Sequence, residues 1–186
     1  MGKSIVIIGD TAAGKSSVLK ELTTWGFDRV VPFTTRPMRS EELNSNEYKQ
    51  VSDDMFKSMQ CRGDFAEWTT YNTHFGKWHY GILKRDVQSK FRWRHNALIV
   101  NPKSLDVLNE FDLFVVHLKV PKDVLLKRLE KRGDVETEYV RRLNDDAMYF
   151  TKAHYDGKID MVVEYNEQHT PKDIARLIVS EFKKHI

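Results

Sequence analysis

Short apolar runs alternate along the chain with stretches whose apolar residues recur at helical spacing. The runs are rich in β-branched residues and are bounded by turn residues, a pattern typical of buried strands. They predict strands over 4–8, 28–34, 64–71, 77–82, 97–100, 112–120 and 159–165. The stretches between them predict helices over 15–24, 55–61, 82–90, 102–108, 121–132, 136–153 and 170–184. This alternation predicts an α/β fold in which helices cover both faces of a parallel sheet.

The first strand and the first helix are joined by a glycine-containing loop. Residues 9–16 read Gly, four residues, then Gly-Lys-Ser, and the strand before and the helix after are the context that a P-loop requires. The amide hydrogens of such a loop bind phosphate oxygens, a lysine adds a full positive charge, and a serine hydroxyl reaches Mg²⁺. The motif therefore predicts a nucleoside triphosphate and Mg²⁺, with Ser16 as the metal-binding residue. The residues of the loop predicted to bind the triphosphate are Gly9, Thr11, Ala12, Ala13, Gly14, Lys15, Ser16 and Ser17.

A polar loop over 34–42 contains two arginines three residues apart. Pro37 blocks a continued helix and favours an extended conformation at Arg36. Guanidinium groups bind phosphate oxygens in pairs, and neighbouring hydroxyls such as that of Thr35 complete an anion site. Composition alone also allows an ordinary solvated loop.

Two further features allow more than one interpretation. Glu67 lies between apolar neighbours, so its carboxylate either hydrogen-bonds the amide-like edge of a ligand or faces solvent on an edge strand. The stretch 90–95 interleaves aromatic residues with cations, as in single-stranded nucleic-acid sites, but a stretch this short is more typical of the solvated end of a helix.

Composition narrows the classes of function. With 186 residues, 40% of them hydrophobic, the chain is expected to form one domain, and its net charge of +3 does not demand nucleic acid. The single cysteine, Cys61, cannot form an internal disulfide, which favours a reducing compartment. Apolar runs are shorter than the roughly 20 residues of a membrane helix, and Met1 leads straight into the first strand, leaving no room for a signal peptide. We expect a cytoplasmic protein that binds no membrane.

The sequence shows no motif for a protein-built zinc site or for a serine nucleophile. The seven histidines lack the spacing of metal ligands, and no Gly-x-Ser-x-Gly motif is present. A metal site built from protein side chains alone is therefore not expected.

The order of the motifs after the P-loop resembles the guanylate kinase family of nucleoside monophosphate (NMP) kinases over nearly the whole chain. The residues that carry this resemblance are Thr34-Thr35-Arg36-Pro37-Met38-Arg39, Asn46-Glu47-Tyr48, Phe65-Ala66-Glu67-Trp68, Tyr80-Gly81 and Lys131-Arg132-Gly133-Asp134 with Arg142-Leu143.

The resemblance implies a single three-layer domain over 1–186 with a parallel core sheet flanked by helices. Its core would comprise 1–33, 96–127 and 155–186, its NMP-binding subdomain about 34–93 and its helical lid about 128–154. The activity implied is transfer of a phosphoryl group from ATP to a nucleoside monophosphate, with GMP and dGMP as leading candidates. Nucleotides would be its partners, and the chain could be a monomer or a homodimer.

Individual roles follow from the same resemblance. The catalytic residues implied are Lys15, Arg39, Arg132 and Arg142, and Asn166 would lie near the adenine of ATP. Glu67 would bind the acceptor base. The residues implied to bind the monophosphate are Thr35, Arg36, Arg39, Tyr48, Glu67, Tyr80 and Asn101.

Several positions depart from the family pattern. Residues 10–13 read Asp-Thr-Ala-Ala where the family usually has Pro-Ser-Gly-Ala, and about four extra residues separate Trp68 from Tyr80. Pro32 replaces a hydroxyl residue, Ile82 a Ser or Thr that contacts guanine, and Asn101 an Asp. A site that loses hydrogen bonds to its base discriminates less strongly, so the base preference is expected to be broader or altered.

Two other functions are compatible with the sequence. A catalytically inactive guanylate-kinase-like module would bind phosphopeptides, and a P-loop kinase could phosphorylate a non-nucleotide small molecule. The intact Lys15 and Ser16 and both predicted lid arginines, Arg132 and Arg142, favour the NMP kinase. Helical spacing leaves open whether Arg141 or Arg142 faces the site.

Overall fold

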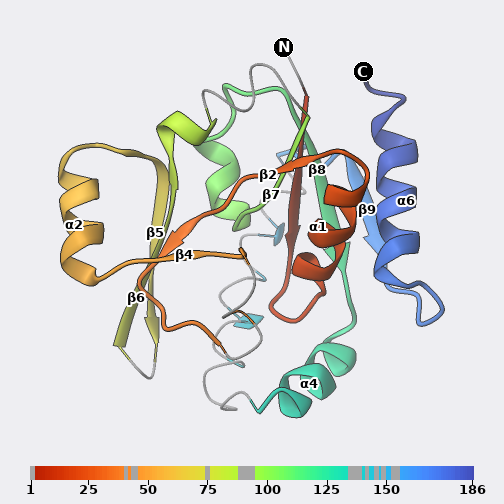
Figure 1. The fold of residues 1–186 in the computed structure, drawn as a ribbon. Coiled ribbons are helices and arrows are strands. Elements are labelled where there is room, and N and C mark those ends of the chain that lie inside the picture. The colour runs from red at the N-terminus through yellow and green to blue at the C-terminus, as the bar shows by residue number, and fades with distance from the viewer. Residues whose placement is uncertain are drawn as a thin grey trace.

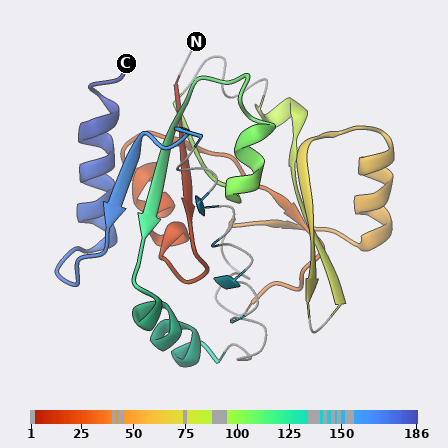
Figure 2. The ribbon, with the colours of Figure 1, turned by 180° about the vertical axis from the view of Figure 1, so that it is seen from behind.

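The fold contains two sheets that lie beside each other (Figure 1). A computed structural model describes residues 3–39, 42, 46–73, 76–87, 95–133, 140, 143–144, 147, 150–151 and 156–186. The larger sheet is the core of the α/β fold, and the smaller sheet lies on the side of the molecule opposite α6 in both views (Figures 1 and 2).

The core sheet has five strands, and every described pair in it is parallel. Its order is β2 (Asp28–Arg29), β7 (Asn96–Ile99), β1 (Ser4–Gly9), β8 (Leu113–Lys119) and β9 (Met161–Glu164). All six residues of β1 are buried, because it is the central strand and is covered on both faces. The predicted parallel sheet is thus confirmed, with the carboxyl ends of its strands at one edge.

Helices cover both faces of this sheet (Figure 2). Ile5 and Ile7 pack with α1 (Lys15–Thr24), α4 (Lys122–Lys131) and α6 (Pro171–Phe182). The alternate side chains Val6 and Ile8 pack on the other face with the 3₁₀ helix η2 (Pro102–Asp106) and with Phe150. The sheet and its two helical layers confirm the predicted three-layer architecture.

The smaller sheet has the order β4 (Lys49–Gln50), β3 (Phe33–Thr34), β6 (Gly76–Leu83) and β5 (Phe65–Thr73). Strands β5 and β6 form an antiparallel hairpin, and β3 pairs antiparallel with β6. The helix α2 (Asp53–Cys61), capped by the Ser52 hydroxyl, packs Phe56 and Met59 against Phe65 and Leu83. This sheet has its own small core.

Four predicted elements differ from the structure. The single strand expected over 28–34 is two strands in different sheets, because the chain leaves the core sheet after Val30 and Pro32 has no N–H to continue a ladder. The helix expected over 82–90 begins only at Lys84, since Ile82 and Leu83 complete β6. The helix expected over 102–108 is a short 3₁₀ helix, and the strand expected over 159–165 is limited to β9.

Much of the predicted lid lies outside the described residues. The described residues 140, 143–144, 147, 150 and 151 have helical backbone, in agreement with the predicted helix over 136–153. The division into core, NMP-binding subdomain and lid stays a prediction. Within the described ranges, every helix is too short or too polar to span a bilayer.

Candidate functional site

The P-loop lies between β1 and α1, at the carboxyl edge of the core sheet. Gly14, with φ of 94°, precedes α1 in the left-handed region that glycine adopts most readily. Gly9 lies so close to β8 that an added Cβ would approach the Leu118 carbonyl oxygen to 2.8 Å. Ala12 has φ of 63° at the position where the family usually has glycine, a strain of roughly 1–2 kcal/mol for a residue with a Cβ. The loop therefore keeps its turn despite the altered residues.

Lys15 lies across this loop. Its Nζ donates to the carbonyl oxygens of Gly9 and Asp10, each at 2.7 Å. Ser16 follows in the first turn of α1 and is half-buried. The predicted residues of the P-loop are thus arranged around one turn, with the lysine ammonium beside the loop backbone.

The residues of the P-loop fit a magnesium ion bound mainly through a nucleotide. Mg²⁺ takes oxygen ligands and usually keeps several waters, so one serine hydroxyl with phosphate oxygens is a suitable set. Among the residues that the structure describes, no group of three or more His, Cys, Asp or Glu side chains could hold a metal ion.

The helix α4 contacts the P-loop through a residue that the sequence analysis missed. Arg128 Nη1 donates to the Ala12 carbonyl oxygen at 3.1 Å, and its guanidinium lies 5.4 Å from the ring centroid of Tyr165. Asn166, the next residue along the chain, accepts the Gln168 N–H through Oδ1. The Arg128 contacts bring Tyr165, at the end of β9, close to the P-loop. The position of Asn166 near the adenine stays a prediction.

The loop that follows β3 forms the second half of the site, and Arg36 is the most buried cation described there. It is 5% exposed, and its Nε donates to the Tyr80 hydroxyl at 3.0 Å while Nη1 donates to the Pro37 carbonyl oxygen at 2.9 Å. Its guanidinium also lies 5.5 Å from the centroid of the Tyr48 ring. Arg36 is therefore held rigidly rather than solvated in an open loop.

Glu42 completes this cluster and was also missed by the sequence analysis. Both of its carboxylate oxygens accept from Arg36 Nη2 at 2.7 Å, and Oε2 accepts the Arg39 backbone N–H at 2.9 Å. The Arg39 guanidinium lies 3.6 Å from Oε1. One buried carboxylate thus contacts both arginines of the predicted anion site.

Three tyrosines extend from this cluster toward the core sheet. The Tyr80 ring meets Tyr48 and Tyr71 edge to face, with centroids 5.8 and 5.6 Å apart. Burial raises the pKa of Tyr48 to about 12, so its hydroxyl stays neutral and can donate a hydrogen bond at neutral pH.

Glu67 lies at the other end of the pocket. Burial raises the pKa of its carboxyl, while a hydrogen bond from the Ser104 hydroxyl and the charge of Lys103 oppose that shift. Ile82 is its cross-strand partner in the β5–β6 hairpin. The strand β5 does lie at the edge of the smaller sheet, but Glu67 lines a pocket and pairs with Ser104 instead of facing solvent.

Asn101 joins the two sheets. Its Nδ2 donates to the Tyr71 hydroxyl at 2.7 Å, and its Oδ1 accepts the Lys103 N–H at the start of η2. Asn101 thus lies at the predicted site, and Tyr71 is a pocket residue that the sequence analysis did not identify.

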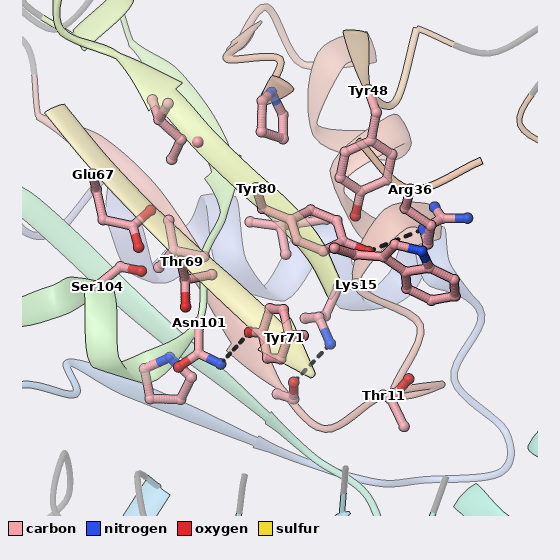
Figure 3. Close-up of a pocket in the computed structure, with 18 of the residues that line it drawn as sticks. Thr11, Lys15, Arg36, Tyr48, Glu67, Thr69, Tyr71, Tyr80, Asn101 and Ser104 are labelled. Atoms are coloured by element: carbon pink, nitrogen blue, oxygen red, sulfur yellow. Dashed lines mark hydrogen bonds between the residues drawn. The ribbon is translucent and has the colours of Figure 1, made fainter. Parts of the chain in front are cut away.

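Residues from the P-loop, the arginine cluster and the Glu67 end surround one cavity of about 220 Å³ (Figure 3). Glu67 and Ser104 lie toward one side, Lys15 and Arg36 toward the other, and Tyr71 between them. The residues that line the cavity include Gly9, Thr11, Lys15, Pro32, Arg36, Arg39, Tyr48, Glu67, Thr69, Tyr71, Trp78, Tyr80, Ile82, Asn101 and Ser104. The arrangement places the P-loop lysine, the two arginines and the Glu67 carboxylate around one cavity.

Some predicted residues lie elsewhere. Thr35 accepts the His79 N–H through its hydroxyl, and it lines a neighbouring depression with Pro37 and Trp78. Arg132 caps the exposed end of α4. Arg141 and Arg142 lie outside the described residues, so which of them faces the site stays open.

The chain is similar to known proteins over nearly its whole length. The family model described as guanylate kinase matches residues 1–181. The chain is 27% identical to a guanylate kinase of Nitrosomonas europaea, with 97% of this chain and 90% of that protein covered. It is also 27% identical to a guanylate kinase of Thermotoga maritima, over 98% of this chain and 89% of that protein.

A solved structure agrees at the level of the fold. The crystal structure of guanylate kinase from Anaplasma phagocytophilum superimposes with a TM-score of 0.69 at 17% identity, covering 99% of this chain and 86% of that chain.

Proposed function

Because the chain belongs to the guanylate kinase family of nucleoside monophosphate kinases, we propose that it phosphorylates GMP and dGMP with ATP as donor. The observation that carries this proposal is the single cavity shared by Lys15, the two arginines and Glu67. A donor phosphate bound by the P-loop and an acceptor phosphate bound by the arginines would meet within it.

The reaction needs positioning and neutralisation of charge more than covalent work by the protein. An oxygen of the acceptor phosphate attacks the γ-phosphorus of ATP, the bond from that phosphorus to the β–γ bridging oxygen breaks, and ADP leaves. Lys15 neutralises charge on the donor side. Arg36 and Arg39, with the hydroxyls of Tyr48 and Tyr80, hold the acceptor phosphate in line.

A magnesium ion bound by Ser16 and the donor phosphates would neutralise charge on the β- and γ-oxygens. We propose that Arg132 and the lid arginine Arg142 add cations as the lid closes, and that closure excludes water, the competing acceptor. We propose that the adenine lies near Asn166, which follows Tyr165, the residue whose ring lies beside Arg128.

The base end of the cavity favours guanine. An ionised Glu67 accepts two hydrogen bonds, and guanine presents two adjacent donors, the N1–H and the N2 amino group. Ser104 holds this carboxylate, and its hydrogen bond favours the charged form against the effect of burial. Adenine presents an acceptor at N1, which an ionised carboxylate repels.

At the same end of the cavity, an apolar residue replaces the hydroxyl residue of the family pattern. Ile82 lies opposite Glu67 and presents an apolar side chain where a hydroxyl would serve guanine O6. The Asn101 amide already donates to Tyr71. We therefore propose that guanine is accepted with weaker discrimination against other bases than in a family member with a hydroxyl at this position.

ATP consumption measured over a panel of NMPs and dNMPs tests both parts of this proposal. GMP or dGMP should give the highest kcat/KM, and Ile82→Thr should raise the ratio of GMP to AMP turnover about 5- to 10-fold by adding one hydrogen bond. The matched control is Ile82→Val, which has the shape of threonine without the hydroxyl and should leave the ratio unchanged.

Two results of this panel would contradict the proposal. Turnover of another monophosphate with neither GMP nor dGMP accepted would overturn the guanine preference. Absence of turnover with every nucleotide, alongside intact ATP binding, would favour a binding module or a non-nucleotide acceptor.

A further inference from the structure

Glu42 contacts both acceptor-side arginines and has no role in the chemistry described above. Its side chain is 5% exposed, and so is buried as deeply as that of Arg36. A buried carboxylate of this kind is strongly unfavourable unless cations and hydrogen-bond donors surround it. Here Arg36 Nη2 and the Arg39 backbone N–H supply those donors, at 2.7 and 2.9 Å.

The three side chains form one electrostatic unit. Arg36 and Arg39 carry like charges and approach the same carboxylate, with Nη2 of Arg36 at 2.7 Å and Nη1 of Arg39 at 3.6 Å. Without an anion between them, these like charges would repel each other, more strongly than in water because Arg36 is buried. Glu42 therefore offsets the repulsion that a two-arginine phosphate site creates.

The contacts also fix the direction in which Arg36 points. Of its five N–H donors, Nε donates to Tyr80, Nη1 contributes one to Pro37, and Nη2 faces Glu42. Glu42 thus binds one edge of the guanidinium, and Tyr80, which lines the cavity, binds another edge. The planar group has little freedom to rotate away from the pocket.

The carboxylate lies behind the arginines rather than in the acceptor site. Arg36, Arg39, Tyr48 and Tyr80 line the cavity, whereas Glu42 is buried outside the set of described residues that line it. A carboxylate that competed with the acceptor phosphate would have to occupy the cavity itself. Its position is that of a support for the two cations.

We propose that Glu42 is a positioning residue that holds Arg36 and Arg39 in the geometry needed to bind the acceptor phosphate. The inference rests on the proposed function, since it assigns Glu42 to the acceptor half of that site. It makes Glu42 a determinant of acceptor affinity that contacts no substrate.

Glu42→Gln tests this role, because it keeps the shape of the side chain and removes its charge. The dissociation constant of GMP, measured by calorimetry without ATP, should rise about 10-fold or more, as expected when hydrogen bonds between charged groups are lost. The acceptor KM should rise with it, and the KM for ATP should stay within about twofold of the wild type. The matched control is Glu164→Gln, which removes an exposed carboxylate paired with Lys119 on the core sheet.

If Glu42 served only to stabilise the fold, Glu42→Gln would give a different result. The substitution would lower the melting temperature and leave the GMP dissociation constant unchanged, and that result overturns the proposal. If Glu42→Gln does not fold, Glu42→Asp keeps the charge on a shorter side chain and should still weaken GMP binding while ATP binding persists; unchanged GMP binding there also overturns it.

A double-mutant cycle separates action through the arginines from an independent effect. In an Arg39→Ala background, Glu42→Gln should change the GMP dissociation constant by clearly less than it does alone. Full additivity would contradict the positioning role. Wild-type protein that binds GMP without turnover would refute the proposed function alone, whereas wild-type protein that does not bind GMP would refute both.

Discussion

Lys15→Ala should abolish turnover, with kcat reduced about 10³-fold or more. The ammonium group lies beside the P-loop backbone, 2.7 Å from the carbonyl oxygens of Gly9 and Asp10, where the donor phosphates would bind. Its loss removes a full positive charge from the γ-phosphoryl group as charge develops on the leaving oxygen. Steady-state kinetics with saturating ATP and GMP would measure the loss.

Lys20→Ala is the matched control for this change. Lys20 lies on the same helix, is exposed, and should tolerate the substitution with normal kcat. Near-normal activity in Lys15→Ala would contradict a P-loop kinase mechanism. A comparable loss in Lys20→Ala would show that damage to α1 explains the result instead.

Arg39→Ala should lower kcat about 10²-fold and raise the acceptor KM about 10-fold together. Its guanidinium lines the cavity, and its side chain is 30% exposed, so it can follow a phosphate that moves toward the donor. An interaction that strengthens in the transition state affects kcat as well as KM. Initial rates over a matrix of ATP and GMP concentrations would separate the two constants.

The control for Arg39 is Arg85→Ala. Arg85 is an arginine with 77% of its side chain exposed, so its loss should leave both constants unchanged. If Arg39→Ala changed only the KM for ATP, Arg39 would act on the donor and not on the acceptor, and its assignment to the acceptor phosphate would be wrong.

The donor half of the site could be predicted because its residues are contiguous. β1, the P-loop and α1 follow one another without interruption, and the glycine spacing fixes the turn between them. The helix predicted over 15–24 has the same bounds as α1. Local sequence is sufficient where the whole feature lies within one strand–turn–helix unit.

The crossing between the sheets could not be predicted in the same way. Residues 28–34 read as one apolar run, but β2 pairs with β7 and β3 pairs with β6. The pattern of apolar residues records burial and not the sheet in which each residue is buried. Pro32 was the available signal, because a residue without an N–H marks a break in a ladder.

The supporting residues of the acceptor half were missed for a related reason. Ser104 lies on a 3₁₀ turn and Glu42 in a polar loop, and their partners Glu67 and Arg36 come from other elements. Such pairs depend on tertiary geometry rather than on spacing along the chain. Arg128 was only weakly indicated by the sequence. It lies four residues before Arg132, which follows α4, so the two arginines lie on the same side of the helix.

Direct detection of the product tests the central claim. The purified protein, incubated with ATP, Mg²⁺ and either GMP or dGMP, should form GDP or dGDP in a one-to-one ratio with ADP, as separated by ion-exchange chromatography. ADP without a guanine diphosphate, or neither product under conditions in which ATP is bound, would contradict the account.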